Sequence, residues 1–566
     1  ETTFTSATGR QIENVVFEHK TENLGTKSGK RCFKYVAKKS VTNCLTGRTT
    51  IIEASDYEDG NPQKITTTQG NVVEEKTMTY ERKGSWCKNR VSCLTTKMIA
   101  DGQEQVRKVL SFYDDRGNQT KEIADPDDEN EFVTEYKNIN HFGQALLVER
   151  SANGTTRRSE FEYSPSGRFM TAKTDEMGDR YEYDWDENTG LLKSKTDRKG
   201  TVRFSYDGFG NLTETNFADG ITETSVTRWA TQENSLGAKY YTYHVKSGSA
   251  PVVTWYDNVG NEVLKETFGL NNKKISVFTQ YNSDGTKSRV SAPTFSSDPQ
   301  SWATVYSYDE YGRVTSLITP AGKSTTKYEK SSTTTVSPEG RKKMSYDASG
   351  RIVSIETNGK SVNYEYYPSG KIKTSTPEGG ASISVEYDLQ GRRTRLTDPD
   401  GGVQETKYNG FGELLWSGQS VHKKGDTIAT EYSYAENGLL LSKTTNGKIT
   451  RYNYDNHNRI VDIEIQGEHR QSFTYDEFDR VVRQKEEIDG KIFESRKEYD
   501  EFGRVRKETY PSGFFTVNHY DRNGILYEVT DSLDRSVWKL LEEDAYGQSL
   551  RTQKGARESV FGYDEQ

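Results

Sequence analysis

The chain has 566 residues, of which 31% are hydrophobic, and its mean hydropathy is −0.92. Such low hydropathy borders on that of disordered chains, but 35 Tyr, 22 Phe and 7 Trp argue for packed structure, because disordered segments are poor in aromatic residues. The 77 basic and 85 acidic residues are interspersed and give a net charge of −8, which argues against a nucleic-acid-binding protein with a basic surface. No run approaches the roughly 18 apolar residues of a membrane helix. The composition favours an all-β protein whose core is built from tyrosine.

The first region in chain order, residues 1–104, is β-like and rich in threonine. Val15-Val16-Phe17 and Thr49-Thr50-Ile51-Ile52 are its candidate strands, and the stretch from Tyr80 to Ala100 breaks the repeat described below. Repeat arrays need terminal elements that satisfy their exposed edge. We therefore predict that residues 1–104 form divergent repeats or a cap.

All four cysteines lie in this first region, at Cys32, Cys44, Cys87 and Cys93. None of them forms a C-x-x-C pair, which argues against a zinc site. Two local disulfides, Cys32–Cys44 and Cys87–Cys93, are predicted and would suit an oxidising compartment, with four reduced thiols as the alternative. The chain opens without the charged and then apolar start of a signal peptide, as expected of a mature chain or an excised piece.

From residue 105 onward a motif recurs: Tyr and Asp, two variable residues, Gly, and then Arg or Asn. We call its first residue the lead tyrosine. The lead tyrosine and the glycine of full copies are Tyr206 and Gly210, Tyr308 and Gly312, Tyr346 and Gly350, Tyr387 and Gly391, and Tyr499 and Gly503. Counted from Tyr346, with Tyr367 as the next, successive lead tyrosines are 21, 20, 21, 26, 20, 21, 24 and 21 residues apart. A near-constant period over hundreds of residues predicts a repeat architecture.

The chemistry of one unit predicts a β-hairpin. In Phe204-Ser205-Tyr206 the aromatic residues are two apart, so they share one face of a strand. The Asp that follows can bond its own backbone and the Gly supplies a positive φ, which together favour a tight turn. A second turn such as Asn358-Gly359, Asn446-Gly447 or Asp489-Gly490 closes the unit. Because two strands of about seven residues cannot bury their aromatic face alone, neighbouring units must stack.

The repeat frame divides the rest of the chain into three predicted regions. Residues 105–228 hold the first block of repeats. Residues 229–255 form an irregular insertion in which the frame is lost, and since insertions in repeat proteins usually lie on one face, we expect partner contacts there. Residues 256–566 hold the second block, which stops within a unit at Tyr563-Asp564-Glu565-Gln566.

An array of this length predicts a curved sheet. Roughly 40 strands at about 4.8 Å each would make a ribbon on the order of 190 Å long. Open sheets seldom exceed about ten strands without curling or splitting, and a flat ribbon would expose a long edge. We therefore predict an all-β fold in which the hairpin array forms a curved, spiralling sheet, like a shell or cocoon.

The repeated motif resembles that of the Rhs/YD-repeat family, from about residue 105 to the end of the chain. The run from Ser166-Gly167-Arg168 through Asp184-Trp185-Asp186 to Gly210-Asn211-Leu212 is most similar to large secreted bacterial Rhs proteins. Those proteins resemble the B and C components of insecticidal toxin complexes and, more distantly, animal teneurins. The resemblance implies a secreted or cell-surface protein whose hollow β-hairpin shell encloses a C-terminal toxin or other polypeptide, with no enzymatic activity and no cofactor of its own.

Two features of that family are missing. Its shell normally ends in an Asp-Pro-x-Gly-Leu motif, where self-cleavage frees the toxin, and a variable effector domain follows. The nearest match is Asp398-Pro399-Asp400-Gly401, but Gly402 and further repeats follow it, so we interpret it as a turn. The resemblance thus implies that the self-cleaving end and the cargo lie downstream, outside this chain.

Motifs for catalysis or metal binding are lacking. The sequence has no G-x-S-x-G and no H-E-x-x-H motif, and its seven histidines are scattered. Asp184-x-Asp186-x-Asn188 resembles the start of a calcium loop, but Thr189 stands where that loop needs glycine, which predicts an ordinary turn. We predict no catalytic, cofactor-binding or metal-binding residues. Two alternatives to the shell stay open: a cell-surface protein that binds glycans through exposed aromatic side chains, and a purely structural connector.

Overall fold

The computed structural model describes residues 2–5, 10–23, 32–83, 87–231, 237–420 and 427–564, without the side chains of residues 22, 23, 32, 88 and 427. In these residues, β-strands and the turns between them make up almost the whole chain. The one helical element that they contain is a single 3₁₀ turn, η1 (Leu270–Asn272). The predicted all-β fold is confirmed.

The chain folds into two compact units, each assembled from segments far apart in the sequence. Unit 1 comprises Glu1–Glu160, Tyr308–Ser316 and Ser324–Gly447, and unit 2 comprises Phe161–Ser307, Leu317–Lys323 and Lys448–Gln566. Each unit therefore contains an earlier and a later run of strands. The division of the sequence into residues 1–104, 105–228, 229–255 and 256–566 stays a prediction.

Unit 1 is built from two runs of strands. Its earlier run contains β1 (Thr2–Thr5), β2 (Gln11–Asn23), β3 (Cys32–Asn43), β4 (Thr49–Glu58), β5 (Asn61–Gln69), β6 (Val72–Lys83), β7 (Cys87–Ala100), β8 (Gln103–Tyr113), β9 (Gln119–Ala124), β10 (Phe132–Ile139), β11 (Ala145–Ala152) and β12 (Thr155–Tyr163). Its later run contains β27 (Gly322–Tyr328), β28 (Ser332–Ser337), β29 (Gly340–Tyr346), β30 (Ile352–Thr357), β31 (Lys360–Tyr366), β32 (Ile372–Pro377), β33 (Ile383–Tyr387), β34 (Arg393–Asp398), β35 (Gly402–Tyr408), β36 (Leu414–Ser420), β37 (Thr427–Tyr434) and β38 (Leu440–Thr445). Strand β26 (Val314–Thr319) lies at the division between the units.

Unit 2 has the same construction. Its earlier run contains β13 (Met170–Thr174), β14 (Arg180–Trp185), β15 (Leu192–Asp197), β16 (Gly200–Tyr206), β17 (Leu212–Asn216), β18 (Thr222–Trp229), β19 (Tyr240–Lys246), β20 (Val252–Tyr256), β21 (Glu262–Phe268), β22 (Lys274–Tyr281), β23 (Lys287–Ser291), β24 (Thr294–Phe295) and β25 (Trp302–Tyr308). Its later run contains β39 (Lys448–Tyr454), β40 (Ile460–Ile465), β41 (His469–Tyr475), β42 (Val481–Ile488), β43 (Lys491–Tyr499), β44 (Val505–Thr509), β45 (Phe515–Tyr520), β46 (Leu526–Asp531), β47 (Ser536–Glu543), β48 (Ser549–Lys554) and β49 (Arg557–Val560).

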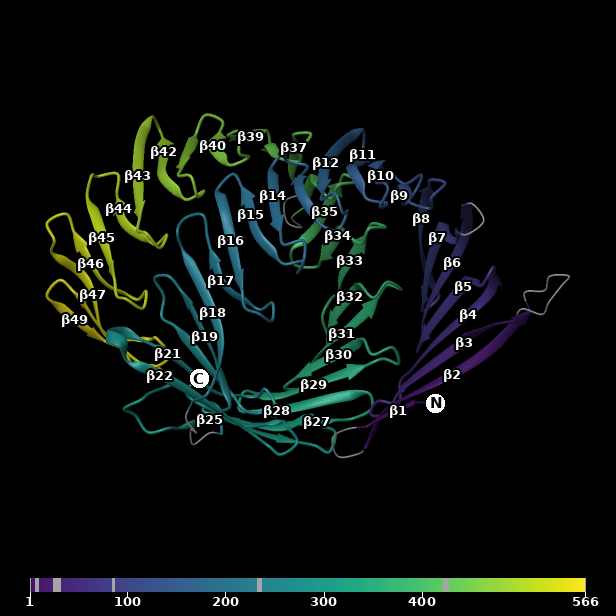
Figure 1. Cartoon of the computed structure of the whole chain (residues 1–566), viewed down its shortest axis with the longest axis horizontal. Coiled ribbons are helices and arrows are strands. Elements are labelled where there is room, and N and C mark those ends of the chain that lie inside the picture. The colour runs from purple at the N-terminus through teal and green to yellow at the C-terminus, as the bar shows by residue number, and fades with distance from the viewer. Residues whose placement is uncertain are drawn as a thin grey trace. The chain divides into compact units, whose positions relative to one another are not determined.

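Within each run, successive strands pair antiparallel as a row of hairpins (Figure 1). In the hairpin of β6 and β7, for example, the register runs from Val72 opposite Ala100 to Lys83 opposite Cys87. The row is interrupted near β22, which pairs with β21, with β23 and with the two-residue strand β24, while β23 goes on to pair with β25. Neighbours in the sequence are thus neighbours in space, as a hairpin repeat requires.

The region expected to be an irregular insertion, residues 229–255, keeps the antiparallel ladder. Strand β18 pairs with β19 from Glu223 opposite Lys246 to Trp229 opposite Tyr240, and β19 pairs in turn with β20. Residues 232–236, between β18 and β19, lie outside the described part of the chain. The partner contacts expected for this region stay a prediction.

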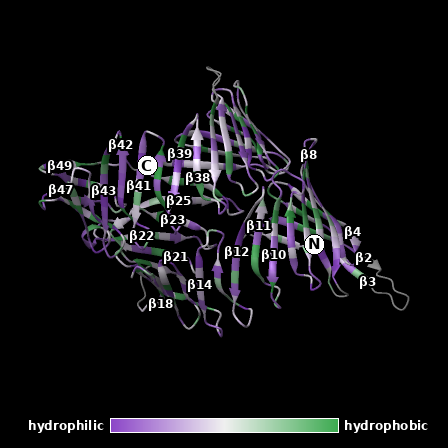
Figure 2. Ribbon diagram, turned by 90° about the horizontal axis from the view of Figure 1, so that it is seen from above, coloured by the Kyte–Doolittle hydropathy of each residue, from purple (hydrophilic) through white to green (hydrophobic). Residues whose placement is uncertain are grey.

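Hydrophilic and hydrophobic residues alternate along many strands (Figure 2). In β16, Phe204 and Tyr206 are half-buried, while Arg203 and Ser205 between them are exposed. The buried apolar side chains of the described residues are Val15, Ala37, Cys87, Ala100, Val148, Ala152, Ala172, Ile221, Ala238, Val263, Leu264, Leu270, Ile275, Pro368 and Leu540. The expectation of a tyrosine core is therefore wrong. Small and aliphatic side chains are buried, whereas the lead tyrosines stand half-buried on a strand face.

The two predicted disulfides are also wrong, because Cys44, Cys87 and Cys93 are free thiols. Cys32 begins β3 and Cys44 follows its last residue, while Cys87 and Cys93 both lie on β7. At about 3.3 Å per residue these pairs are separated by roughly 40 Å and 20 Å. A disulfide needs Cα atoms within about 7 Å. Close spacing in the sequence was misleading because an extended strand, not a loop, joins each pair.

Candidate functional site

Each repeat unit turns at its Tyr and Asp, as the turn after Tyr499 illustrates. The N–H of Gly503 donates to the carbonyl of Asp500 at 3.0 Å, and the N–H of Asp500 donates to the carbonyl of Arg504 at 2.9 Å. Gly503 has a φ of +75°, and the strand register shifts between Glu498 and Tyr499. These features define a tight turn that ends in a β-bulge with its glycine in the left-handed region. We call it the Tyr–Asp turn.

The aspartate of the motif holds this turn together. Oδ1 of Asp500 accepts hydrogen bonds from the N–H groups of Phe502 and Arg504, each at 2.9 Å, and Oδ2 accepts one from Nε of Arg504 at 2.7 Å. Burial alone would raise the pKa of Asp500, but the hydrogen bonds from Arg504 and Phe502 hold it below its ordinary value. The same pair recurs at Asp309–Arg313, Asp347–Arg351, Asp388–Arg392, Asp455–Arg459, Asp476–Arg480 and Asp531–Arg535.

The arginine of the motif fastens one hairpin to the next. The guanidinium carbon of Arg504 lies 4.3 Å from the ring centre of Tyr520, the next lead tyrosine, whose hydroxyl donates to the carbonyl of Val505 at 3.0 Å. A cation within about 6 Å of an aromatic ring centre is attracted by the negative face of the ring. The contact recurs in Arg313–Tyr328, Arg351–Tyr366, Arg392–Tyr408, Arg459–Tyr475 and Arg480–Tyr499.

The tyrosines and glycines of the motif predicted from the sequence lie in Tyr–Asp turns in the structure. Tyr206, Tyr308, Tyr346, Tyr387 and Tyr499 are half-buried. The φ angles are +83° at Gly210, +79° at Gly312, +94° at Gly350, +80° at Gly391 and +75° at Gly503. These are left-handed conformations that glycine adopts without steric cost.

The structure shifts one lead tyrosine by one residue, from Tyr367 in the sequence count to Tyr366. Strand β31 ends at Tyr366, whose hydroxyl donates to the carbonyl of Ile352. The N–H of Tyr367 donates to the carbonyl of Lys371, which is the bond that the motif aspartate makes elsewhere. Tyr366 is therefore the lead tyrosine, and Tyr367 occupies the aspartate position.

The role of the last motif residue was missed by reasoning from the sequence, which recorded Arg or Asn without assigning a contact. The signal that could have revealed it is the recurrence of Asp and Arg four residues apart across a turn. Where Asn stands instead, as at Asn211, its Nδ2 donates to Oδ2 of Asp207 at 3.0 Å. Asn thus completes the turn without contributing a cation.

In unit 2 the Tyr–Asp turns of the later run contact the turns that close the units of the earlier run, here called return turns. Nη1 of Arg504 donates to the carbonyl of Gly248 at 3.1 Å, across 256 residues of sequence. The carbonyl of Asn523 accepts a hydrogen bond from the N–H of Ala250 at 3.0 Å. The return turn at residues 247–250 is therefore seated between two successive Tyr–Asp turns. We call this row of contacts the seam of unit 2.

The seam of unit 2 is closely packed at Gly248. A Cβ placed on Gly248 would lie 2.4 Å from Cγ of Phe502, and one placed on Gly524 would lie 2.5 Å from the carbonyl oxygen of Gly248. Their φ angles are +75° and +84°. Glycine is therefore required here both for the conformation and for the close approach of the two turns.

Ion pairs contribute to the same seam. Oδ2 of Asp479 accepts a hydrogen bond from Nη2 of Arg198 at 2.5 Å and lies 3.2 Å from Nζ of Lys199, while its Oδ1 accepts one from Nη1 of Arg459 at 2.9 Å. Arg198 and Lys199 belong to a return turn of the earlier run. Burial would raise the pKa of Asp479, but the hydrogen bonds from Arg198, Lys199 and Arg459 lower it from 3.8 to about 2. The carboxylate therefore stays charged in mildly acidic solution.

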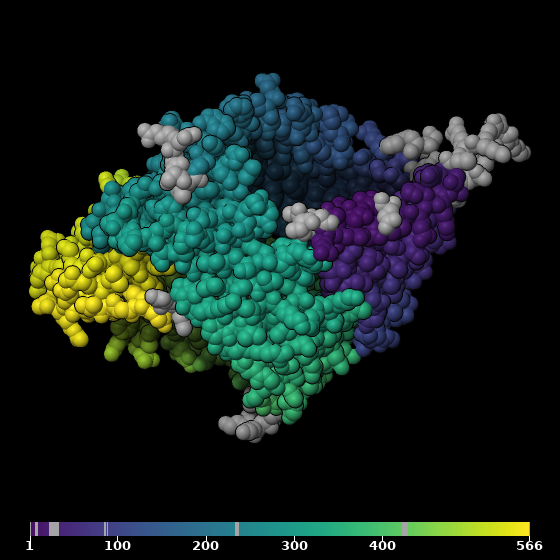
Figure 3. Space-filling view, turned by 90° about the horizontal axis from the view of Figure 1, so that it is seen from below, coloured from purple at the N-terminus to yellow at the C-terminus, as the bar shows by residue number. Residues whose placement is uncertain are grey.

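Unit 1 contains a seam of the same kind. The N–H of Gly410 donates to Oδ1 of Asn153 at 2.6 Å, across 257 residues of sequence. Nε2 of Gln390 donates to Oδ2 of the buried Asp125 at 3.2 Å, across 265 residues. A Cβ placed on Gly70 would lie 2.7 Å from Ala348. The two runs adjoin in Figure 3, where purple residues of the earlier run lie against teal-green residues of the later run.

Arg157 forms the most buried ion pair of this seam. Its Nη2 donates to Oε1 of Glu413 at 2.6 Å, and the two side chains are only 10% and 15% exposed. Its guanidinium carbon lies 3.9 Å from the ring centre of Phe411, which meets the ring of Phe132 edge-on at 5.5 Å. Removing one partner of such a pair would leave the other charge buried and uncompensated.

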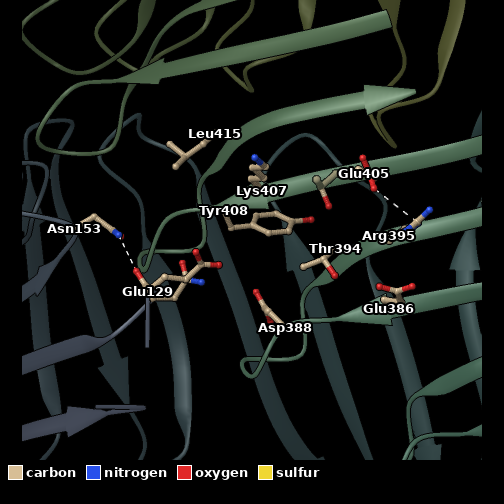
Figure 4. A pocket seen from close by; sticks show the side chains of 12 residues that line it. Glu129, Asn153, Glu386, Asp388, Thr394, Arg395, Glu405, Lys407, Tyr408 and Leu415 are labelled. Atoms are coloured by element: carbon tan, nitrogen blue, oxygen red, sulfur yellow. Dashed lines mark hydrogen bonds and ion pairs between the residues drawn. The ribbon is translucent and has the colours of Figure 1, made fainter. Parts of the chain in front are cut away.

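An open hollow of about 520 Å³ lies beside the seam of unit 1 (Figure 4). Glu129 and Asn153 line one side, where Nδ2 of Asn153 donates to the carbonyl of Glu129 at 3.0 Å. Arg395, Glu405 and Tyr408 line the other, where Nε of Arg395 lies 3.7 Å from Oε1 of Glu405. Arg395 and Glu405 are directly opposite on β34 and β35. Cross-strand ion pairs of this kind stabilise a sheet.

The segment that resembles a calcium loop is a turn. Oδ1 of Asp186 accepts hydrogen bonds from the N–H groups of Asn188 and Thr189, each at 2.9 Å. The hydrogen bonds from Thr189 and Asn188 lower the pKa of Asp186. Across the described ranges, no three or more His, Cys, Asp or Glu side chains group in a way that could hold a metal ion. None of the helices described is long and apolar enough to cross a membrane.

The repeated turns and their fold match those of known proteins. The family model of the RHS repeat matches residues 188–222, 296–324 and 366–403. The solved structure of the TcdB2–TccC3 complex superposes with a TM-score of 0.73 at 11% sequence identity, over 98% of this chain and 40% of that chain. The chain contains RHS repeats and resembles proteins of the Rhs/YD-repeat family. Another solved structure with the same fold is the Tc holotoxin pore of Photorhabdus luminescens, with a TM-score of 0.70 at 11% identity, over 98% of this chain and 41% of that one.

Three curated proteins are similar to parts of this sequence. Teneurin-3 of Mus musculus is 24% identical over 421 residues, which are 69% of this chain and 14% of that protein. Double-stranded DNA deaminase toxin A of Burkholderia cenocepacia is 28% identical over 140 residues, 22% of this chain and 10% of the toxin. The tRNA3(Ser)-specific nuclease WapA of Bacillus spizizenii is 24% identical over 216 residues, 36% of this chain and 8% of the nuclease. The chain thus spans only a small part of each relative.

Proposed function

We propose that this Rhs/YD-repeat chain is a structural, non-enzymatic wall segment of a shell that encloses a polypeptide, such as a toxin domain. The observation that carries the proposal is the extent of the likeness to the TcdB2–TccC3 structure, which covers 98% of the chain. Almost the whole chain is thereby accounted for by hairpin repeats. A separate catalytic domain would need residues outside that fold.

The relatives support a toxin as the enclosed polypeptide. One is named a deaminase toxin and another a nuclease, and the similar segments are 140 and 216 residues long. These segments are a small share of each relative, so the named activities belong to those whole proteins. We propose that a polypeptide of that class accompanies this chain, and that the chain acts outside the cell or at its surface.

The seams give the proposal a physical basis. A wall that retains a polypeptide needs its successive rows of hairpins to meet without gaps. The N–H of Ala250 donates to the carbonyl of Asn523, and the N–H of Gly410 donates to Oδ1 of Asn153, so turns of separate runs are joined by hydrogen bonds. Contacts at Gly248 are tight enough to exclude even a methyl group.

The glycan-binding alternative has no specific support among the described tryptophans. Trp185 stacks on Phe169 and donates its indole N–H to the carbonyl of Met170. Arg289 lies over the ring of Trp302, and Lys407 lies over that of Trp416. Trp229 is exposed, at 77%, but a single exposed tryptophan is not the row of solvated tryptophans that a glycan platform needs.

The proposal is tested by fusing an unfolded, protease-sensitive reporter to the C-terminus of the chain. We expect the fused reporter to survive a proteinase treatment that degrades the free reporter, because the wall keeps the enzyme away from it. Intact reporter is measured by gel electrophoresis over time.

The matched control carries Gly248→Ala, which we expect to loosen the seam of unit 2 and so to shorten the survival of the reporter. Cleavage of the fused reporter at the rate of the free reporter, with the wall itself folded and uncut, would contradict the proposed enclosure.

A further inference from the structure

The seam of unit 2 follows a positional rule. The third residue after a lead tyrosine contacts a return turn: Phe502 packs on Gly248, and Nδ2 of Asn523 donates to the carbonyl of Gly269 at 3.0 Å. Asn523 is 8% exposed. At these two turns, the third residue after the lead tyrosine of the later run is therefore covered by the earlier run.

The same position of the earlier run is not buried. It holds Phe209 and Val259, which are 94% and 74% exposed. The aspartates of these two turns bond within their own turns, Asp207 to the N–H groups of Phe209 and Asn211, and Asp257 to that of Val259. The Tyr–Asp turns of the earlier run of unit 2 thus present an exposed edge with the residue pattern of a seam. We call it the socket edge.

The socket edge contains a hollow of about 470 Å³ between the Tyr–Asp turn at residues 257–260 and that at residues 282–285. Val259, Val263 and Tyr281 line it. In the later run, the corresponding space between two successive Tyr–Asp turns is filled by the return turn at Gly248. The hollow therefore corresponds to the space that the return turn at Gly248 fills between two Tyr–Asp turns of the later run.

The later run of unit 2 carries the complementary feature on its other edge. A Cβ placed on Gly467, Gly490 or Gly513 of its return turns meets no atom within 4 Å, in contrast to one placed on Gly248. The return turn between β46 and β47 has the same aspartate–arginine pair as a Tyr–Asp turn, Asp531–Arg535, and its Leu533 is 68% exposed. We call this the plug edge.

We propose that the socket edge of unit 2 binds the plug edge of a second copy of this chain. The return turn at Leu533 fits the hollow by its chemistry, because an apolar side chain meets Val259 and Val263. Arg535, whose side chain is 72% exposed although it bonds Asp531, would then lie near the carboxylates of Asp257 and Asp284. The contact continues the turn-on-turn pattern of the seam and joins two different surfaces, so copies add head to tail.

Sedimentation velocity of the full chain at about 1 to 100 µM tests this inference. We expect the sedimentation coefficient to rise with concentration, and Val259→Asp or Leu533→Asp to weaken association about tenfold or more, as expected for a buried apolar contact. Both residues are exposed in one copy, so each variant should fold, which circular dichroism checks.

A mixture of the two variants makes the test specific. The Val259→Asp copy keeps its plug edge and the Leu533→Asp copy keeps its socket edge, so an equimolar mixture should form dimers but no larger species. Val560→Asp is the matched control, since Val560 is 75% exposed and lies on β49.

Two results would overturn the inference. The first is a monomer at every concentration. The second is association that Val560→Asp abolishes and Val259→Asp leaves intact, which would mean pairing through a strand edge.

Discussion

At the scale of the residue, three contacts hold each motif and its neighbour together. The aspartate closes its own turn, the arginine binds that aspartate and lies over the next lead tyrosine, and the tyrosine hydroxyl returns a hydrogen bond to the preceding hairpin. Asp500, Arg504 and Tyr520 show all three contacts. Charged hydrogen bonds between an arginine and a carboxylate are stronger than neutral ones, which explains why the motif combines these residues.

Replacing the aspartate should destabilise one Tyr–Asp turn. Asp500→Ala removes the acceptor for two N–H groups and for Arg504, at a cost of about 2 kcal/mol. We expect faster amide hydrogen exchange in residues 499–506 and a lower apparent melting temperature. The control is Asp207→Ala, whose partner is Asn211 rather than an arginine, and which should have a smaller effect. Equal effects in the two turns would refute a special role for arginine.

The charge of Asp479 should make the seam of unit 2 sensitive to acid. Because its pKa in the folded protein, about 2, lies below its ordinary 3.8, the stability that it contributes is fully present above pH 4 and is lost as the pH falls through about 2. Asp479→Asn keeps the side-chain shape and tolerates the local φ of +68°. We expect the melting temperatures of wild type and variant to differ at pH 7 and to converge toward pH 2.

The control for the acid prediction is Asp534→Asn, at a φ of +57° in a return turn of the later run. It makes the same chemical change in the same backbone conformation, outside the described seam contacts. A difference for Asp479→Asn that stayed constant down to pH 2 would contradict the assignment of the ion pairs to the seam.

At the scale of the element, hairpins are joined in two ways. Neighbours along the chain share strand hydrogen bonds, while runs far apart in the sequence meet at contacts in which at least one partner lies in or next to a turn. In unit 2 a single return turn, at Gly248, contacts Phe502, Arg504 and Gly524. The second kind of junction involves fewer bonds and depends on glycine.

The two roles of glycine can be separated by one pair of variants. Gly248→Ala imposes both a strained positive φ and a clash with Phe502, whereas Gly285→Ala imposes the strain alone, since its φ is +83° and a Cβ there meets nothing within 4 Å. The strain costs about 1 to 2 kcal/mol in each case. We expect Gly248→Ala to lower the melting temperature more and to speed hydrogen exchange at residues 499–506. Equal melting temperatures would show that the seam does not depend on close approach.

Hairpins could be predicted from the sequence because their determinants are local. A tyrosine two residues after an aromatic, then aspartate and glycine, specifies a strand and a turn within ten residues, and Gly350 and Gly391 take the expected positive φ. The seams could not be predicted, because Arg504 and Gly248 are 256 residues apart and the sequence around one residue does not indicate that it contacts the other. The disulfide prediction failed for a related reason. Spacing alone did not reveal that β7 is extended between Cys87 and Cys93.

At the scale of the whole molecule, an array of repeats is held by contacts between nearest neighbours, and its stability is close to a sum of local terms. The seams add hydrogen bonds across 254 to 281 residues of sequence within a unit. Such contacts make neighbouring runs depend on one another, which a wall around a polypeptide requires.

Small-angle X-ray scattering of the purified chain tests the proposed wall most directly. A wall that encloses a polypeptide should give a pair-distance distribution weighted toward long distances, as for a hollow or strongly curved particle. A distribution that fits a solid globule or a straight rod would contradict enclosure by this chain.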